Sequence, residues 1–288
     1  SSHGIQVASI AVGNQDLCAL EPIRGIAPAA SALFRPSDEA WQTTFGILNS
    51  SQVKVLNNSW VHNDPISHIN DLVSESIDTY SYVGGALAVC ATAGPGQTGA
   101  YLATPMNAKN VLTVGGIKYV NLNLGTAFAD SAGSLSPSAQ RGPTLDGRLK
   151  PELVAPCGVH DSNGVPEHGV VAASLELLPS YCVDGVSGSY DAFVGTSYSA
   201  PFVAGVAARL LERSPSDSPL MLKAILINTA IPLKGNKTWG RDPVAAGQAG
   251  FANCTFGYGL VNAGIVGDES ISRLIKVEQT IGRGASTP

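Results

Sequence analysis

Residues 195–205, GTSYSAPFVAG, open the stretch that decides the fold, a helix with a regular apolar face. From here apolar side chains recur with the i, i+3, i+4, i+7 and i+8 spacing of a buried helical stripe, at Val203, Val206, Ala207, Leu210 and Leu211. We expect Pro201 to fall in the first turn, where its missing N–H costs nothing, and Ser214 and Pro215 to end the helix. The stretch therefore predicts a long core helix that begins close to Ser197.

Two serines, Ser197 and Ser199, lie at the expected start of this helix and allow two interpretations. Serine and threonine are favoured N-cap residues, and most of them cap helices without doing chemistry. The start of a helix also brings together unbonded N–H groups and the positive end of the helix dipole, which can stabilise an oxyanion. A serine held there is therefore also well placed for acyl transfer, and the local pattern permits both interpretations.

The rest of the chain alternates helical patterns with short apolar runs. Continuous runs with β-branched residues at 86–94 and 110–117 are typical of central parallel strands that are buried on both faces. We expect further strands at 31–34, 53–60 and 153–156, and helices at 2–12, 37–48 and 66–84, the last with Ile66, Ile69, Leu72, Val73 and Ile77 near one face. This alternation predicts an α/β fold with helices on both sides of a parallel sheet and a site at the carboxyl ends of the strands.

Composition and charge exclude several classes of partner. The 288 residues are 44% hydrophobic and only 14% charged, with a net charge of −5 and no Lys/Arg cluster, so neither a nucleic acid nor an anionic membrane is expected as a partner. No apolar run reaches the roughly 18 residues of a membrane span, and no signal peptide opens the chain. The sequence therefore predicts a compact globular protein.

Five cysteines are too few and too scattered for a disulfide scaffold or a zinc site. Cys90 lies in an apolar run and is expected as a buried thiol, whereas Cys157 and Cys182 flank a loop and could pair in an oxidising compartment. N-x-S/T sequons, which permit secretion, occur at Asn49, Asn57, Asn236 and Asn253. We expect a secreted or extracytoplasmic protein.

A second motif, near the start of the chain, bears on the function of the helix at 195–213. HGIQVAS, residues 3–9, places a histidine at the start of an apolar helix, and together with GTSYSAP it resembles the subtilisin-like serine proteases. Further segments resemble that family's motifs in the family's order: GIAPAASALF (25–34), VLNNSW (55–60), VCATAGPG (89–96), NVLTVGGI (110–117), DGRLKPELVAP (146–156), LKAILINTA (222–230) and FGYGLVNAGIV (256–266). The resemblance implies a three-layer subtilisin-like α/β fold, in which a mostly parallel sheet is flanked by helices. It further implies a catalytic domain over residues 1–267 and a tail over 268–288 that forms an edge strand or a linker.

The resemblance also assigns site residues. Ser197 matches the nucleophile and His3 the general base, which takes the hydroxyl proton and returns it to the leaving amine. Ser59 matches a position beside the edge where the family binds the substrate backbone as an added strand. The oxyanion and substrate-binding positions correspond to Gly94, Pro95 and Thr196, and no catalytic position corresponds to His62, His68, His160 or His168.

Two features depart from the family pattern. The family's catalytic aspartate lies upstream of the histidine in a D-[ST]-G turn, but His3 is the third residue here and no aspartate of the chain follows a strand in such a turn. We therefore expect this aspartate on a missing or separately cleaved N-terminal segment, retained as a second polypeptide. The second departure is Pro95, which stands where the family has its oxyanion asparagine and supplies neither a side-chain amide nor an N–H. Loss of that donor in a family member slows the reaction about 10²–10³-fold.

The leading hypothesis is a serine endopeptidase that cuts protein or peptide substrates through an acyl-enzyme on Ser197, without an organic cofactor. The resemblance allows calcium but assigns no site for it. The alternative is a pseudoprotease of the same fold that binds peptides or a partner protein in the substrate groove. A peptide ligase or cyclase, which would pass the acyl group to an amine, is a third possibility. Retention of both His3 and Ser197 favours the enzyme, whereas Pro95 favours the pseudoprotease.

Overall fold

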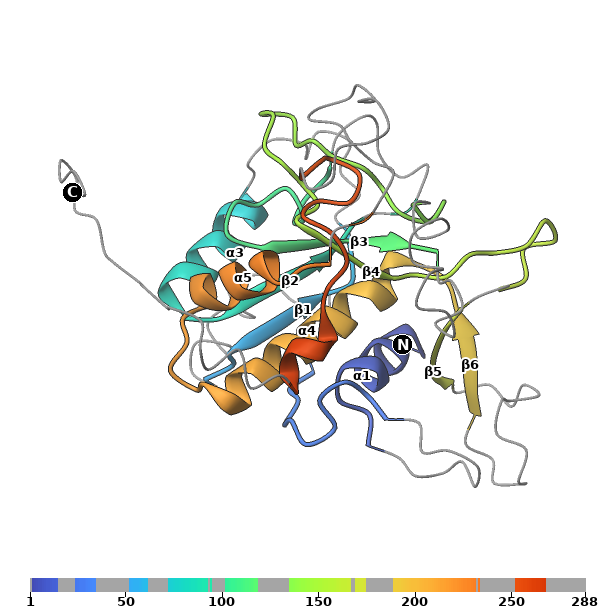
Figure 1. Ribbon diagram of the computed structural model, residues 1–288, viewed down its shortest axis with the longest axis horizontal. Coiled ribbons are helices and arrows are strands. Elements are labelled where there is room, and N and C mark those ends of the chain that lie inside the picture. Colours follow the sequence, from blue (N-terminus) through green and yellow to red (C-terminus); the bar gives the residue numbers. More distant parts are fainter. Residues whose placement is uncertain are drawn as a thin grey trace.

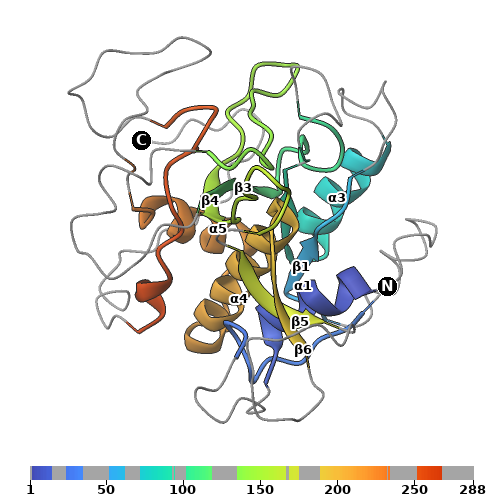
Figure 2. The same ribbon diagram turned by 90° about the vertical axis from the view of Figure 1, so that its right-hand side faces the viewer.

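The computed structural model describes residues 2–14, 24–34, 52–61, 72–92, 94, 102–118, 135–166, 169–174, 189–231, 233 and 252–267. Figure 1 and Figure 2 show their arrangement as a sheet between helices, with a separate two-stranded hairpin beside the sheet.

The central sheet has four parallel strands in chain order: β1 (Val55–Asn58), β2 (Leu87–Ala91), β3 (Leu112–Ile117) and β4 (Leu153–Pro156). The register pairs Val55 with Leu87, Val89 with Leu112, and Val114 with Leu153. The parallel sheet predicted from the apolar runs is therefore confirmed. The strand expected at 31–34 is wrong, because these residues lie exposed outside the sheet.

Helices cover both faces of the sheet. Leu87, Val89 and Ala91 of β2 belong to a core that includes α4 (Thr196–Arg213) and α5 (Pro219–Asn228). The alternate residues Ala88 and Cys90 belong to a second core with α3 (Leu72–Val83) and residues 102–108. Because successive side chains of a strand point to opposite faces, two covered faces require the continuous apolar run seen in the sequence.

Helix α3 corrects one detail of the predicted stripe. Ile77 is fully buried, but Leu72 is 78% exposed and stands at the first residue of the helix. Its place in the apolar period does not bury it, because no described element covers that end of α3. The second core is instead completed by Tyr80.

The predicted stripe of α4 is confirmed, since Val203, Val206, Ala207 and Leu210 are buried and Leu211 is half-buried against the same core. The predicted start close to Ser197 is confirmed as well, since α4 begins at Thr196. The N-cap is Gly195, whose φ of 148° suits glycine, and it makes no side-chain cap bond. Neither serine therefore caps α4, and Pro201 is an interior residue of the helix instead of a first-turn residue.

Helix α1 (Ser2–Val12), predicted at 2–12, packs along α4 and against an antiparallel hairpin, as Figures 1 and 2 show. The hairpin strands are β5 (Val170–Ser174) and β6 (Ser189–Phe193). Ile10, Ala172 and Tyr198 form a small core among the three elements. The helix that carries His3 is therefore held from two sides. A short 3-10 helix, η2 (Ala263–Val266), closes the described chain.

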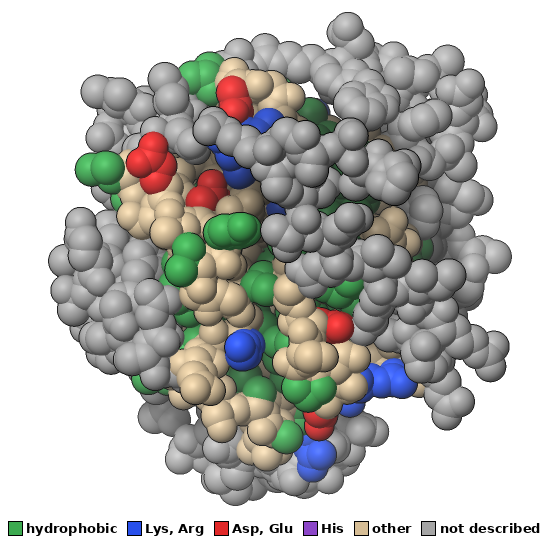
Figure 3. Space-filling view, turned by 90° about the vertical axis from the view of Figure 1, so that its left-hand side faces the viewer, with side chains coloured by type: hydrophobic (Ala, Val, Ile, Leu, Met, Phe, Trp, Pro, Cys, Tyr) green, Lys and Arg blue, Asp and Glu red, His purple; other side chains and the backbone are tan. Residues whose placement is uncertain are grey.

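No described helix is long and apolar enough to cross a membrane. On the face drawn in Figure 3, the described basic and acidic side chains are interspersed instead of gathered into patches of one sign. This face gives no sign of a polyanion-binding surface.

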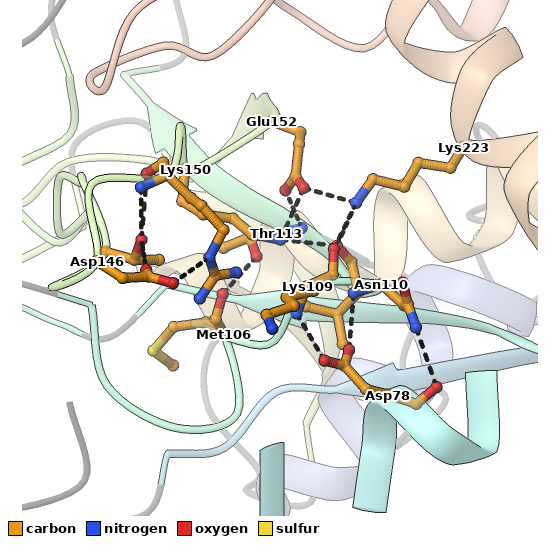
Figure 4. A network of polar contacts seen from close by, with 12 residues as sticks. Asp78, Met106, Lys109, Asn110, Thr113, Asp146, Lys150, Glu152 and Lys223 are labelled. Carbon is orange, nitrogen blue, oxygen red and sulfur yellow. Dashed lines mark hydrogen bonds and ion pairs between the residues drawn. The ribbon is translucent and has the colours of Figure 1, made fainter. Parts of the chain in front are cut away.

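A buried ion cluster occupies the amino ends of β3 and β4 (Figure 4). Lys150 Nζ donates to Glu152 Oε1 at 2.7 Å and to the Val111 carbonyl at 2.8 Å. From α5, Lys223 Nζ also donates to Glu152 Oε1 at 2.7 Å, and the N–H of Thr113 donates to Glu152 Oε2 at 2.8 Å. Burial lowers the pKa of Lys150 to about 8 even beside Glu152. Every charged group of the cluster has a partner, as burial requires.

Several predictions concern residues outside the described ranges: the helix at 37–48, the first part of the helix at 66–84, the tail at 268–288, Pro95, His62, His68, His168, Cys182, Asn49 and Asn236.

Candidate active site

The first turn of α4 lies across the carboxyl ends of the sheet strands. Thr196 Oγ1 donates to the carbonyl of Thr92, which directly follows β2. Ser199 Oγ donates to the carbonyl of Pro156, the last residue of β4, at 2.8 Å. These two bonds place Ser197, which lies between them in sequence, at the edge where sites form in parallel sheets.

Ser197 is half-buried and contacts the segment that follows β1. Its Oγ donates to the carbonyl of Ser59 at 3.5 Å, a long contact that leaves the hydroxyl loosely held. Ser59 Oγ in turn donates to the carbonyl of Ser197 at 2.8 Å, and Asn57 Nδ2 donates to Ser59 Oγ at 3.0 Å. The structure thus brings together Ser59 and Ser197, two predicted site residues 138 positions apart.

His3 lies in the first turn of α1 and is also half-buried. Its ring packs edge-on against Tyr198, with centroids 6.0 Å apart and an interplanar angle of 64°. Tyr198 Oη donates to Gln6 Oε1, one turn after His3, at 2.9 Å. His3 is therefore held against the residue that follows Ser197. Burial lowers the pKa of His3 below its usual 6.5, so the imidazole is neutral at pH 7 and able to accept a proton.

The remaining predicted oxyanion positions are partly described. Gly94 is half-buried, and a Cβ added to it would meet no atom of the described residues within 4 Å. Thr92, two residues earlier, is only 3% exposed, yet its Oγ1 has no hydrogen-bond partner among the described residues. A buried polar side chain directly after β2 is therefore unsatisfied within the described part of the chain.

Cys157 lies directly behind the site as a buried free thiol, and its carbonyl accepts the N–H of Gly195 at 2.9 Å. The pairing of Cys157 with Cys182 is therefore wrong for this structure. Burial raises the pKa of the Cys157 thiol, which keeps it protonated. The predicted buried thiol of Cys90 is confirmed, with its pKa raised to about 12 by burial.

Nothing in the described part of the chain gathers three or more His, Cys, Asp or Glu side chains closely enough to hold a metal ion. His160 is exposed.

The profile of the Subtilase family (Peptidase_S8) matches residues 1–259, most of the 288-residue chain. The chain belongs to the subtilase family.

Curated relatives match only parts of the chain. Serine protease AprX of Bacillus subtilis (strain 168) is 31% identical over 148 residues, which cover 49% of this chain and 30% of that protein. The protein y4bN of Sinorhizobium fredii is 33% identical over 181 residues, or 56% of this chain and 38% of that protein. The chain thus spans well under half the length of these two relatives.

Solved subtilase structures confirm the fold. The prenylagaramide maturation protease PagA has a TM-score of 0.63 at 21% identity, covering 92% of this chain and 82% of that chain. Fervidolysin from Fervidobacterium pennivorans has a TM-score of 0.62 at 19% identity, covering 92% of this chain and 36% of that chain. The predicted three-layer subtilisin-like α/β fold is therefore confirmed, and at these identities the likeness concerns the fold alone.

Three residues of this subtilase site were missed from the sequence: Gln6, Asn57 and Tyr198. Gln6 had a signal, because it is a polar residue three positions after His3 in an otherwise apolar helix. The sequence also contained a signal for Tyr198, because it directly follows the predicted nucleophile Ser197. The contact of Asn57 with Ser59 had none, because neighbouring polar residues at a strand end are common.

Proposed function

We propose that this subtilase chain carries the nucleophile and the general base of a serine endopeptidase, with Ser197 as nucleophile and His3 as base. The observation that carries the proposal is the packing of the half-buried His3 ring against Tyr198, directly beside Ser197. Family membership supports the general chemistry. The substrates we propose are proteins or peptides, and the proposed reaction needs no organic cofactor.

In the proposed reaction, Ser197 Oγ attacks the carbonyl carbon of the scissile peptide bond while His3 takes its proton. The tetrahedral intermediate collapses as the C–N bond breaks, and the leaving amine takes the proton from His3. A water molecule then attacks the carbonyl carbon of the acyl-enzyme ester while His3 takes its proton. The C–O bond to Ser197 breaks, Ser197 Oγ takes the proton from His3, and the acid product leaves. The lowered pKa of His3 favours this role, because a neutral imidazole is the form that accepts a proton.

Negative charge on the intermediate needs hydrogen-bond donors. The N–H of Ser197 is one candidate, since it lies in the first turn of α4, where N–H groups have no helical acceptor. Pro95 offers no second donor at the family's asparagine position. We therefore propose a slow protease, whose substrate also contacts Ser59, Gly94 and Thr196.

The third catalytic group is proposed to be an aspartate on a polypeptide segment outside residues 1–288. Within the described residues, β1 pairs only with β2, and Val55, Leu56 and Asn57 are half-buried while all of β2 is buried. A further parallel strand would satisfy the second hydrogen-bonding edge of β1. A carboxylate at its carboxyl end would lie at the same edge of the sheet as the strand end that leads to Ser59.

Secretion remains a prediction. Two of the four sequons lie in the described part of the chain, and both asparagines already use their side chains. Asn57 donates to Ser59, and Asn253 Oδ1 accepts from the N–H groups of Thr255 and Phe256 at 2.8 Å each. A glycan at either position would disturb these bonds, so these two sequons give secretion no support.

Labelling with a fluorophosphonate probe tests the nucleophile. With the proposed aspartate-bearing segment present, we expect phosphonylation of Ser197 with loss of fluoride, and no labelling in Ser197→Ala. Ser199→Ala is the matched control, because Ser199 is two residues away but is buried and bonded to Pro156. Label on Ser199 would show that Ser197 is not the nucleophile, and label on neither serine of the folded complex would favour the pseudoprotease. Product masses separate hydrolysis from ligation.

A further inference from the structure

Proline at position 201 leaves one helix carbonyl without its ordinary partner. In an α-helix each carbonyl accepts from the N–H four residues later, so the carbonyl of Ser197 would accept from residue 201. Pro201 has no N–H and lies inside α4. The orphan carbonyl therefore belongs to the proposed nucleophile itself.

The hydroxyl of Ser59 replaces the missing donor. Ser59 Oγ donates to the carbonyl of Ser197 at 2.8 Å, the length of a good hydrogen bond. A serine hydroxyl carries one proton, and its direction depends on what the oxygen accepts. Asn57 Nδ2 donates to Ser59 Oγ at 3.0 Å and so occupies a lone pair, which directs that proton toward Ser197.

We propose that Asn57 and Ser59 are positioning residues for the nucleophile, because together they supply the hydrogen bond that Pro201 removes from the first turn of α4. Asn57 acts through Ser59, and the Ser59 side chain acts on the backbone of Ser197. The Ser59 carbonyl lies 3.5 Å from Ser197 Oγ, so the same residue contacts both the backbone and the side chain of the nucleophile. The inference rests on the proposed function of Ser197.

A cycle of four proteins tests the proposal: the unchanged chain, Ser59→Ala, Pro201→Ala and the double variant. The readout is the second-order rate of fluorophosphonate labelling at Ser197. Loss of one hydrogen bond is expected to slow labelling about three- to tenfold in Ser59→Ala. Alanine at position 201 restores the backbone N–H, so Ser59→Ala in the Pro201→Ala background should slow labelling by much less.

Conservative variants separate positioning from packing. Ser59→Thr keeps the hydroxyl and should label faster than Ser59→Ala. Asn57→Asp keeps the size but replaces the donor by an acceptor, which draws the Ser59 proton away from Ser197, so it should resemble Ser59→Ala. Ser218→Ala is the control for stability alone, because Ser218 caps α5 through the N–H of Met221, away from the site. It should label at the unchanged rate.

The outcomes separate this inference from the proposed function. If the unchanged chain labels at Ser197 and Ser59→Ala labels equally fast, the positioning role is wrong while the nucleophile stands. Equal slowing by Ser59→Ala in both backgrounds would also overturn the role. If the unchanged chain does not label at all, the proposed function fails, and thermal unfolding of the same four proteins still tests the bond. Ser59→Ala should then lower the midpoint temperature of unfolding by about 2–4 °C only when residue 201 is proline. An equal shift in both backgrounds would refute the role of the Ser59 hydroxyl as the replacement donor.

Discussion

The buried polar side chains at the two ends of the parallel sheet differ in whether they have hydrogen-bond partners. At the amino ends of β3 and β4, Lys150, Glu152 and Lys223 are mutually bonded, and each charged group has a partner. At the carboxyl ends of β1 and β2, Asn57 Oδ1 and Thr92 Oγ1 are buried without a hydrogen-bond partner among the described residues. Ser81 Oγ, which precedes β2, is also buried without a partner among the described residues, so the contrast concerns the charged groups of the cluster.

The difference between the two ends concerns how their buried polar groups are satisfied. A buried polar atom without a partner costs about 1–3 kcal/mol, so such atoms are rare unless a ligand, water or further segment satisfies them. The ion cluster bonds α5 to the strands of the sheet without leaving any such atom on its charged groups. We infer that stability is concentrated at the amino end and binding at the carboxyl end.

The largest expected effect on stability is that of Glu152→Gln. Without the carboxylate, two ammonium groups face each other at the amino end, and the free energy of unfolding should fall by about 3–5 kcal/mol. Asp146→Asn is the matched control, because Asp146 also pairs with a cation, Arg148, but its side chain is 56% exposed, and such pairs contribute about 0–1 kcal/mol. Denaturant unfolding measures both. Equal losses would abolish the contrast between the two ends.

A smaller loss is expected for Tyr198→Phe. Removal of the hydroxyl leaves Gln6 Oε1 buried without its donor, at a cost of about 1–3 kcal/mol, and loosens α1 against α4. Labelling at Ser197 should slow as well, because His3 packs against the Tyr198 ring. Tyr258→Phe is the control, since the Tyr258 side chain is 46% exposed. Unchanged stability and labelling in Tyr198→Phe would show that this contact does not position His3.

The smallest effect concerns pH and His3. Burial lowers the pKa of His3 in the folded chain, so between pH 7 and 5 the unfolded chain takes up more protons than the folded chain. The free energy of unfolding should therefore fall slightly with falling pH, relative to His3→Ala. Unfolding at several pH values measures this difference. A rise would mean that the folded state favours the charged imidazole, as it would beside a carboxylate.

Much of the fold could be predicted because its signals are local. The runs at 86–94 and 110–117 are apolar throughout since both faces of β2 and β3 are covered, and the stripe of α4 is buried on one face as its period requires. The strand at 31–34 was wrong, and Leu72 is exposed although it follows the apolar period of α3, because an apolar side chain is buried only where another element covers it.

The site was predictable in part. Ser197 and His3 came from motifs, and α4 begins close to Ser197 as predicted. The cap is the backbone of Gly195 and not a serine, and Pro201 lies one turn further into the helix than predicted. The bond between Ser59 and Ser197 joins positions 138 residues apart, and no spacing in the sequence indicates it.

The rate of fluorophosphonate labelling at Ser197 in the unchanged chain and in His3→Ala, located by peptide mass spectrometry, tests most directly whether these two residues form one site. A general base typically contributes 10²–10⁴-fold, so we expect labelling at Ser197 to slow at least about 100-fold in His3→Ala. In the unchanged chain the rate should stay constant as the pH falls from 8 to 7, since His3 remains neutral there. Equal labelling rates in the two proteins, or label on another residue, would contradict the account.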